Sequence, residues 1–190
     1  MQTINEDIKN GTFKPVYLLY GEEAFLKQSY KKKLRAAISG DDTMNYNYFE
    51  GKGLDVNELI SLADTMPFFS ERRLILIEDS GFFKNANQQL AEYIPSIPEE
   101  TIMLFVESEV DKRGKLYKAV SKKGSVVEFT AQNEQTLTRW ILGILKTVGK
   151  MITSGAMKQF LEKTGTDMER IRQELEKLIC RIYEDNILGK

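Results

Sequence analysis

The residues of this sequence that could do chemistry on a phosphate lie between Gly21 and Lys27, where a glycine turn separates an apolar run from a helical pattern. Phosphate-binding loops of the form G-x-x-x-x-G-K-[ST] occupy such a turn, and their second glycine lets backbone amides wrap the phosphate. When Gly21 is aligned with the first glycine, Lys27 takes the lysine position, and the apolar spacing of the predicted helix places it on the polar face. Leu26 and Gln28, however, replace the second glycine and the hydroxyl residue. We therefore predict that Gly21 and Lys27 belong to a degenerate nucleotide site.

Two acidic pairs bear on the same question. Glu22 and Glu23 place negative charge beside the start of the helix, where the phosphates of a nucleotide would otherwise lie. Glu78 and Asp79 follow the apolar run 74–77, as the acidic residues that hold magnesium do in nucleotide hydrolases. Without a phosphate loop this second pair has nothing to act on. We predict that it forms a solvent-exposed strand end, and that the chain binds no cofactor and no metal.

Histidine is absent from the sequence, and Cys180 is its one cysteine. The lack of histidine excludes Ser-His triads, Cys-His dyads and the usual zinc sites. A single cysteine cannot form an internal disulfide and fits a reducing compartment, so we predict that Cys180 is a small core residue. No catalytic residue is predicted.

The stretch most suggestive of binding is residues 65–70, Thr-Met-Pro-Phe-Phe-Ser, which we name the apolar loop. It precedes the run Leu74–Ile77, which predicts a short strand buried on both faces of a parallel sheet. Because loops lie on the surface, apolar side chains in this one must be covered by the chain itself or by a partner. Composition favours cover by the chain's own domain. Protruding aromatic residues beside an arginine are instead typical of a protein-binding site.

The composition describes a globular protein of 190 residues, enough for one large domain or for one domain and a smaller second one. Hydrophobic residues make up 42% of the chain, yet no apolar run is long enough to span a bilayer, and the N-terminus has no secretory signal. We expect a cytoplasmic protein with no membrane partner. The net charge of −1 gives no global reason for tight nucleic-acid binding, although local basic clusters could contact phosphates.

Strand and helix patterns alternate through the first two thirds of the chain. Apolar runs predict five strands, at residues 15–20, 45–51, 74–79, 101–107 and 125–129. Apolar spacing predicts one helix before the first strand, at residues 5–9, and four helices between the strands, at residues 25–38, 54–64, 88–93 and 111–120. This order predicts an α/β fold, with a five-stranded parallel sheet flanked by helices as in P-loop nucleotide hydrolases.

From about residue 133 the pattern is helical only. Three helices are predicted, and the core candidates of the third are its apolar positions Ile171, Leu175, Leu178 and Ile182. We predict an α/β domain over residues 1–132 and a small all-helical domain, itself incomplete, over residues 133–190.

Several segments resemble the delta subunit family of the bacterial DNA polymerase III clamp loader. The resemblance rests on the order and spacing of residues 16–23, 66–74, Glu107 with 110–116, and 174–178. It implies an AAA+-like first domain without a working ATP site, followed by a small helical lid domain. It also implies a third, collar domain through which the loader assembles, and that the present chain lacks this domain.

The resemblance implies a function as well. Four residues of the apolar loop would bind the beta sliding clamp: Met66, Pro67, Phe68 and Phe69. Phe68 stands where many relatives carry Leu, which keeps the position apolar. Further implied partners are the gamma/tau and delta prime loader subunits and, weakly or indirectly, DNA. The chain would be no enzyme by itself but a component of a complex with DNA-directed DNA polymerase activity.

Two other functions stay open at the level of sequence. An active P-loop ATPase or nucleotide kinase would bind magnesium-ATP. A DNA-binding module would use basic residues that could alternatively contact other subunits: Lys31, Lys32, Lys33, Lys112, Arg113 and Lys115. Charge runs on helices are more often solvated faces, and a DNA-binding module would show a steep dependence of affinity on salt.

Overall fold

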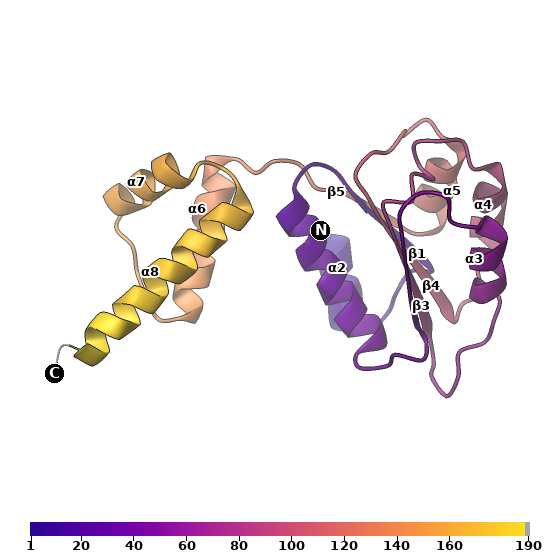
Figure 1. The fold of residues 1–190 in the computed structure, drawn as a ribbon, viewed down its shortest axis with the longest axis horizontal. Helices are drawn as coiled ribbons and strands as arrows, with labels where there is room; N and C mark the ends of the chain where they lie inside the picture. Colours follow the sequence, from indigo (N-terminus) through magenta and orange to yellow (C-terminus); the bar gives the residue numbers. More distant parts are fainter. Residues whose placement is uncertain (189–190) are drawn as a thin grey trace. The chain divides into compact units, whose positions relative to one another are not determined.

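The computed structural model describes the backbone of residues 1–188 and the side chains of residues 1–181. The chain divides into two compact units, Met1–Phe129 and Thr130–Lys190. Figure 1 shows an α/β fold in the first unit and helices alone in the second. The boundary predicted between residues 132 and 133 falls three residues after this division.

The first unit is built on one parallel sheet with the strand order β2-β3-β4-β1-β5. The strands are β1 (Val16–Tyr20), β2 (Tyr46–Glu50), β3 (Arg73–Glu78), β4 (Thr101–Glu107) and β5 (Ser125–Glu128). All five predicted strands are present, and the predicted α/β, AAA+-like architecture is confirmed.

Helices cover both faces of this sheet, because parallel strands need crossover connections. They are α1 (Gln2–Asn10), α2 (Ala24–Ser39), α3 (Val56–Ala63), α4 (Gln88–Tyr93) with the short 3-10 helix η1 (Ile94–Ser96), and α5 (Lys115–Lys123). Helices α3, α4 and α5 pack on one face, and α1 and α2 pack on the other (Figure 1).

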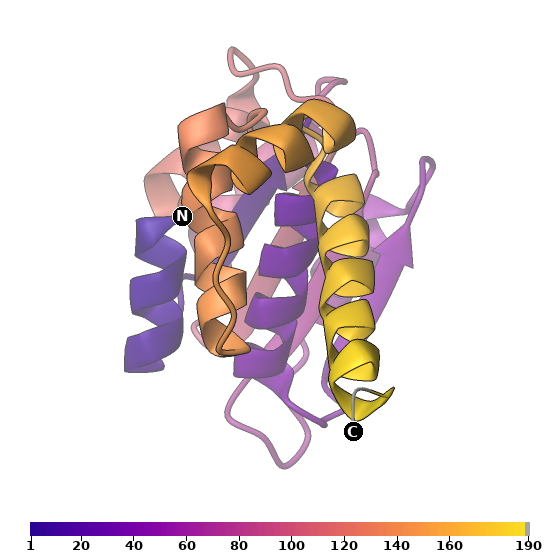
Figure 2. The ribbon, with the colours of Figure 1, turned by 90° about the vertical axis from the view of Figure 1, so that its left-hand side faces the viewer.

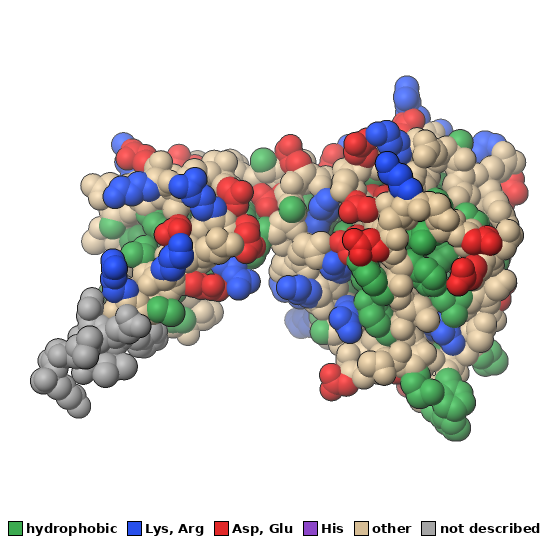
Figure 3. Space-filling view, viewed as in Figure 1, with side chains coloured by type: hydrophobic (Ala, Val, Ile, Leu, Met, Phe, Trp, Pro, Cys, Tyr) green, Lys and Arg blue, Asp and Glu red, His purple; other side chains and the backbone are tan. Residues whose placement is uncertain are grey.

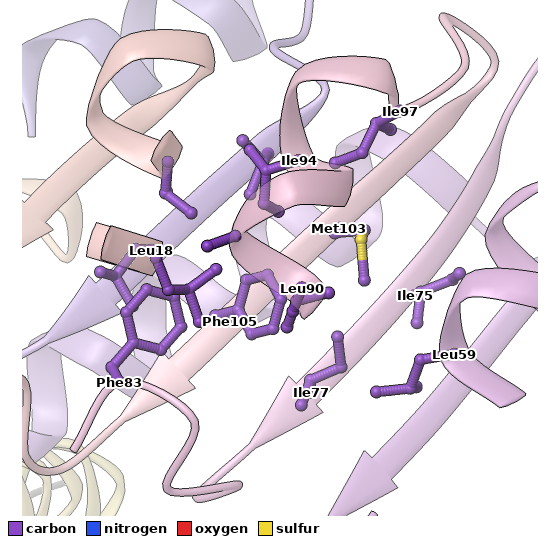
Figure 4. Packing of buried hydrophobic residues seen from close by; sticks show 14 of the residues in the cluster. Leu18, Leu59, Ile75, Ile77, Phe83, Leu90, Ile94, Ile97, Met103 and Phe105 are labelled. Carbon is purple, nitrogen blue, oxygen red and sulfur yellow. The ribbon is translucent and has the colours of Figure 1, made fainter. Parts of the chain in front are cut away.

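The core is divided by the alternation of side chains along the central strands. Met103 and Phe105 of β4 lie in the cluster beneath α3–α5, with Ile75 and Ile77 of β3 (Figure 4). The residues between them point to the α1 and α2 side. Every residue of β3 and β4 is buried, so the prediction of a strand buried on both faces is confirmed.

Helix α5 begins at Lys115, four residues later than predicted. The Asp111 carboxylate accepts a hydrogen bond from the backbone N–H of Arg113, 2.9 Å away, which favours a turn at this point. Gly114 then serves as the N-cap of the helix.

The second unit contains α6 (Glu134–Thr147), α7 (Ser154–Thr164) and α8 (Met168–Leu188). Figure 2 shows α7 lying across one end of α6 and α8. Side-chain caps start the first two helices, from Asn133 onto the Thr136 amide and from Thr153 onto the Ala156 amide. The buried side chains of this unit include Leu137, Ile141, Leu145, Met157, Leu161, Met168, Ile171 and Leu175.

Two predictions for α8 are wrong. Cys180 is exposed, because five residues after buried Leu175 a helix has turned by about 140° away from its buried stripe. Leu178 is also exposed and lies at the rim of the groove between α7 and α8. Ile182 lies outside the described side chains.

Candidate functional site

The apolar loop connects α3 to β3 and carries three exposed hydrophobic side chains. Met66, Phe68 and Phe69 are 78%, 55% and 95% exposed. The two phenyl rings meet edge to face, with their centroids 4.5 Å apart. Figure 3 shows a projecting group of hydrophobic side chains at this end of the first unit. The interpretation in which the loop folds back under its own domain is therefore wrong for these side chains.

The backbone of the loop, in contrast, is held by the side chain of Asn45, just before β2. The Oδ1 atom of Asn45 accepts a hydrogen bond from the Phe68 N–H at 2.6 Å, and its Nδ2 atom donates to the Phe68 carbonyl at 2.9 Å. The same Nδ2 atom donates to the Asp42 carboxylate at 2.8 Å. Hydrogen bonds to Asp42, first from this amide and then from the backbone, hold the pKa of its carboxyl below the ordinary value.

Arg73, the first residue of β3, holds the start of the loop. Its guanidinium is buried and donates to the carbonyls of Thr65, at 3.3 Å, and Met66, at 3.2 Å. A third hydrogen bond, of 3.0 Å, reaches the side-chain oxygen of Asn47. A buried guanidinium needs such acceptors, since an unsatisfied buried charge is costly.

Sequence reasoning assigned no role to Asn45 or Arg73. Asn45 was the first residue of a predicted strand, and Arg73 lay just before the strand predicted from residue 74. The one available signal was the position of Arg73 directly before a fully apolar run, because an arginine that is exposed to solvent does not need to lie beside a buried strand.

The backbone of Phe69 adopts a conformation that is unusual for its residue type. Its φ is 50°, in the left-handed region where a Cβ atom crowds the following carbonyl. A non-glycine residue stays in this region only where its surroundings hold it there. The neighbouring contacts of Asn45 with Phe68 provide such a hold.

The predicted degenerate nucleotide site lies where β1 passes into α2. Gly21 has a φ of 113°, and a Cβ atom on it would lie 2.3 Å from the carbonyl oxygen of Phe129. The Glu23 N–H donates to the same carbonyl at 3.0 Å. Gly21 is therefore required for close packing against the segment after β5, and the turn is in contact with protein where a P-loop would wrap phosphate.

Lys27 is buried, contrary to its prediction as part of the polar face of the helix. Its ammonium donates to the carbonyl of Glu107, the last residue of β4, at 3.3 Å. The Glu23 carboxylate caps α2 by accepting the Phe25 N–H at 3.2 Å. Both groups that would meet a phosphate, the lysine and the helix N-terminus, thus have contacts within the chain.

Glu78 is buried, so its prediction as a solvent-exposed strand end is wrong, whereas Asp79 is exposed. The Glu78 carboxylate accepts from the Lys31 ammonium at 2.8 Å and from the Gln28 amide, also at 2.8 Å. The hydroxyl of Tyr48 lies 3.1 Å from the same carboxylate. Charge-assisted donors from α2 and β2 compensate this carboxylate for its loss of water.

Glu107 provides a second buried carboxylate, also at the carboxyl edge of the sheet. It accepts hydrogen bonds from the Ser80 N–H at 3.2 Å, from the Ser80 hydroxyl and from the Gly81 N–H at 3.1 Å. Burial raises the pKa of the Glu107 carboxyl above its ordinary value, and the hydrogen bonds oppose this shift. The residue thus fixes the turn that follows β3.

The basic cluster of α2 is divided by the fold. Lys31 lies in the ion pair with Glu78 and is largely buried. Lys32 and Lys33 are exposed, and the Lys33 ammonium lies 4.9 Å from the centroid of the Tyr30 ring.

The second basic cluster precedes and begins α5. Lys112 forms an ion pair with Glu128 at 2.7 Å, and Arg113 forms one with Asp111 at 3.0 Å. Both pairs are on the surface, where such contacts contribute little stability. Lys115 is exposed.

Over residues 1–181, no group of three or more acidic or cysteine side chains is arranged to hold a metal ion. None of the helices in the described part of the chain has the length and hydrophobicity needed to cross a membrane.

These features define a class of protein: an AAA+-like α/β unit in which Gly21 and Lys27 contact other parts of the chain, and whose most exposed large hydrophobic side chains, Phe69 and Met66, lie on an anchored apolar loop. Comparison with known proteins agrees with this class. A family model described as "DNA polymerase III, delta subunit" matches residues 17–130. The chain belongs to the DNA polymerase III delta subunit family.

Two curated relatives support this assignment. DNA polymerase III subunit delta of Bacillus subtilis (strain 168) is 27% identical over 193 residues, covering 95% of this chain and 55% of the relative. The probable DNA polymerase III subunit delta of Aquifex aeolicus (strain VF5) is 21% identical over 185 residues, covering 91% and 52%. The chain thus spans about half the length of these relatives.

Two solved structures are similar as well. The DNA clamp loader delta protein of Bacillus subtilis superposes with a TM-score of 0.74 at 26% identity, over 95% of this chain and 57% of that one. A gamma subunit-related protein of DNA polymerase III from Thermotoga maritima gives a TM-score of 0.52 at 12% identity, over 92% and 57%. The second likeness concerns the fold alone.

Proposed function

We propose that this chain is a non-catalytic clamp-loader subunit that binds the beta sliding clamp through Met66, Pro67, Phe68 and Phe69, and helps to open it for loading onto primed DNA. The observation that carries the proposal is the exposed pair of phenyl rings on an anchored loop, in a member of this family. Under this proposal the chain works in the cytoplasm, as part of the DNA polymerase III holoenzyme.

The exposed rings supply enough energy for a transient complex. Burying two Phe side chains gives on the order of 3–6 kcal/mol before the costs of association and ordering. Water-exposed aromatic side chains that insert together into an apolar pocket are typical of the residues that dominate binding energy at interfaces.

Opening a closed ring requires more than affinity. A ligand shifts an equilibrium between closed and open forms only by its preference for the open form. We infer that the apolar loop binds best to a clamp whose subunit interface is open. We infer also that the energy of ATP enters through the gamma/tau subunits, with delta prime as a further neighbour.

Gly21 and Lys27 take no part in nucleotide chemistry under this proposal. The close contact of Gly21 with Phe129 and the hydrogen bond of Lys27 to Glu107 support this view over an active ATPase or kinase. Titration with magnesium-ATP is expected to give no binding heat, and micromolar binding would favour the enzymatic alternative.

The basic residues are proposed as secondary contacts with DNA or with other subunits. The exposed residues Lys32, Lys33 and Lys115 are best suited to this role, whereas Lys31, Lys112 and Arg113 have acidic partners within the chain. A log-log plot of DNA affinity against salt concentration tests it, since its slope rises with the number of phosphates neutralised.

The deciding experiment is binding of the chain to the cognate beta clamp by calorimetry or surface plasmon resonance. The Phe68→Ala/Phe69→Ala variant should lose binding while keeping the melting temperature of the parent. The matched control is Leu142→Ala/Met151→Ala, which removes exposed apolar surface from the second unit and should bind as the parent does. Unchanged binding by the double Phe variant would refute the proposal.

Ring opening is tested separately. A clamp assembled on circular DNA should be released faster in the presence of the parent chain than with the double Phe variant. Binding without faster release would leave the docking role and remove the opening role.

A further inference from the structure

Asn45 is the buried side chain that makes the shortest hydrogen bonds to the backbone of the apolar loop. It is 1% exposed, and both ends of its amide bond to a single residue, accepting from the N–H and donating to the carbonyl of Phe68. An amide that bonds both backbone groups of one residue acts as a neighbouring strand would, and it restrains φ and ψ together. The orientation of the amide is itself fixed, because its Nδ2 atom also donates to Asp42.

Arg73 restrains the start of the same loop. Its guanidinium binds the carbonyls of Thr65 and Met66, so that three of the four residues from 65 to 68 have a backbone group bonded to a buried side chain. The planar guanidinium presents its donors in a rigid fork, which holds two successive carbonyls in a fixed relation. Phe69, whose backbone is strained, is the next residue in the chain after this restrained segment.

Neither anchor uses the apolar side chains of the loop. The hydrogen bonds end on backbone atoms, while the side chains of Met66, Phe68 and Phe69 stay exposed. A loop with a held backbone and free side chains is organised for contact with something outside the chain.

We propose that Asn45 and Arg73 are positioning residues, which hold the apolar loop in its clamp-binding conformation before the clamp arrives. The inference rests on the proposed function and adds two residues that do not touch the clamp. When the loop backbone is already ordered, binding to the clamp does not pay the entropic cost of ordering it. The affinity gained in this way comes from the hydrogen bonds of Asn45 and Arg73 rather than from the phenyl rings.

The first test uses the chain alone. The Phe68 amide hydrogen should exchange slowly with solvent in the parent, because it is bonded to a buried acceptor, and at least tenfold faster in Asn45→Ala. Exchange of the Phe68 amide hydrogen at the rate of an unprotected amide in the parent would overturn the inference, whatever the result of the clamp-binding measurements.

The second test compares affinities for the cognate beta clamp. Asn45→Ala should bind about tenfold more weakly than the parent, since it returns roughly one residue's backbone freedom to the loop. The parent should also bind more tightly than a synthetic peptide of residues 64–72, and Asn45→Ala should close much of that gap. Most of the loss should lie in the association rate, because a mobile loop is seldom in the binding conformation.

Two further variants separate positioning from stability. Asn45→Asp keeps the acceptor for the Phe68 N–H but loses the donor and faces the Asp42 carboxylate, so it should bind no better than Asn45→Ala. Ser80→Ala removes a buried hydrogen bond to Glu107 at the other end of β3. It should lower the melting temperature without changing the affinity for the clamp.

The outcomes distinguish this inference from the proposed function. If Asn45→Ala and Asn45→Asp bind as the parent does while Phe68→Ala/Phe69→Ala loses binding, the positioning role fails and the clamp-binding role stands. If Ser80→Ala weakens binding as much as Asn45→Ala, general stability explains the effect and the positioning role also fails. If the double Phe variant binds normally, the clamp-binding role itself is refuted.

Discussion

Phe69→Ala should weaken clamp binding more than Phe68→Ala, because more of the Phe69 side chain remains to be buried. Phe69 is 95% exposed in the free chain and Phe68 is 55% exposed. Full burial of a phenyl side chain stabilises by about 1.5–3 kcal/mol. In proportion to exposed surface, Phe69 contributes about 2 kcal/mol and Phe68 about 1 kcal/mol, which correspond to about 30-fold and about fivefold in Kd.

The assay measures the Kd of each single variant by surface plasmon resonance, together with its melting temperature. Phe69→Ala keeps a Cβ atom and therefore the same backbone strain, so its melting temperature should equal that of the parent. Met151→Ala, on the second unit, removes a side chain of similar exposure and is the matched control. A larger loss for Phe68→Ala, or equal losses, would refute the argument from exposed surface and would indicate that the packing of the two rings on each other governs binding.

Three further predictions concern the carboxyl edge of the sheet. Gly21→Ala should destabilise the first unit by about 2 kcal/mol or more, through strain and the clash with Phe129, measured as a lower urea midpoint with an unchanged m-value. Lys31→Met should cost about 2–3 kcal/mol in the same assay by leaving Glu78 buried without its cation, and a loss below 0.5 kcal/mol would contradict the burial of this pair. Because the folded-state pKa of Glu107 is raised, its contribution to stability is full below the unfolded pKa and is lost as the pH rises through the folded one; Glu107→Gln should remove this slope, and parallel pH profiles of parent and variant would contradict it.

The sequence alone determined the architecture of the first unit. Continuous apolar runs such as Leu74–Ile77 occur where a strand is buried on both faces, and helical spacing between them leaves a parallel sheet as the consistent solution. The prediction of a degenerate nucleotide site also rests on residue types alone, because it follows from the absence of a second glycine and of a hydroxyl residue.

Only the tertiary structure decided how the polar residues are used. Glu78 was predicted to be solvated and Lys27 to lie on a polar face, yet both are buried with partners that lie 47 and 80 residues away in the sequence. The local sequence shows that a residue is polar, but it does not show which distant group will form a hydrogen bond or ion pair with it. Burial of a charge depends on that partner.

The same division applies to the candidate site. Residue types marked Met66, Phe68 and Phe69 as an anomaly in a loop, but they left open whether the chain or a partner covers them. Exposure, a property of the whole packed unit, settles that the chain itself does not. Sequence pattern did not reveal the contacts of Asn45 and Arg73, because their hydrogen bonds join the loop to the starts of β2 and β3 only when the sheet has assembled and brought those segments together.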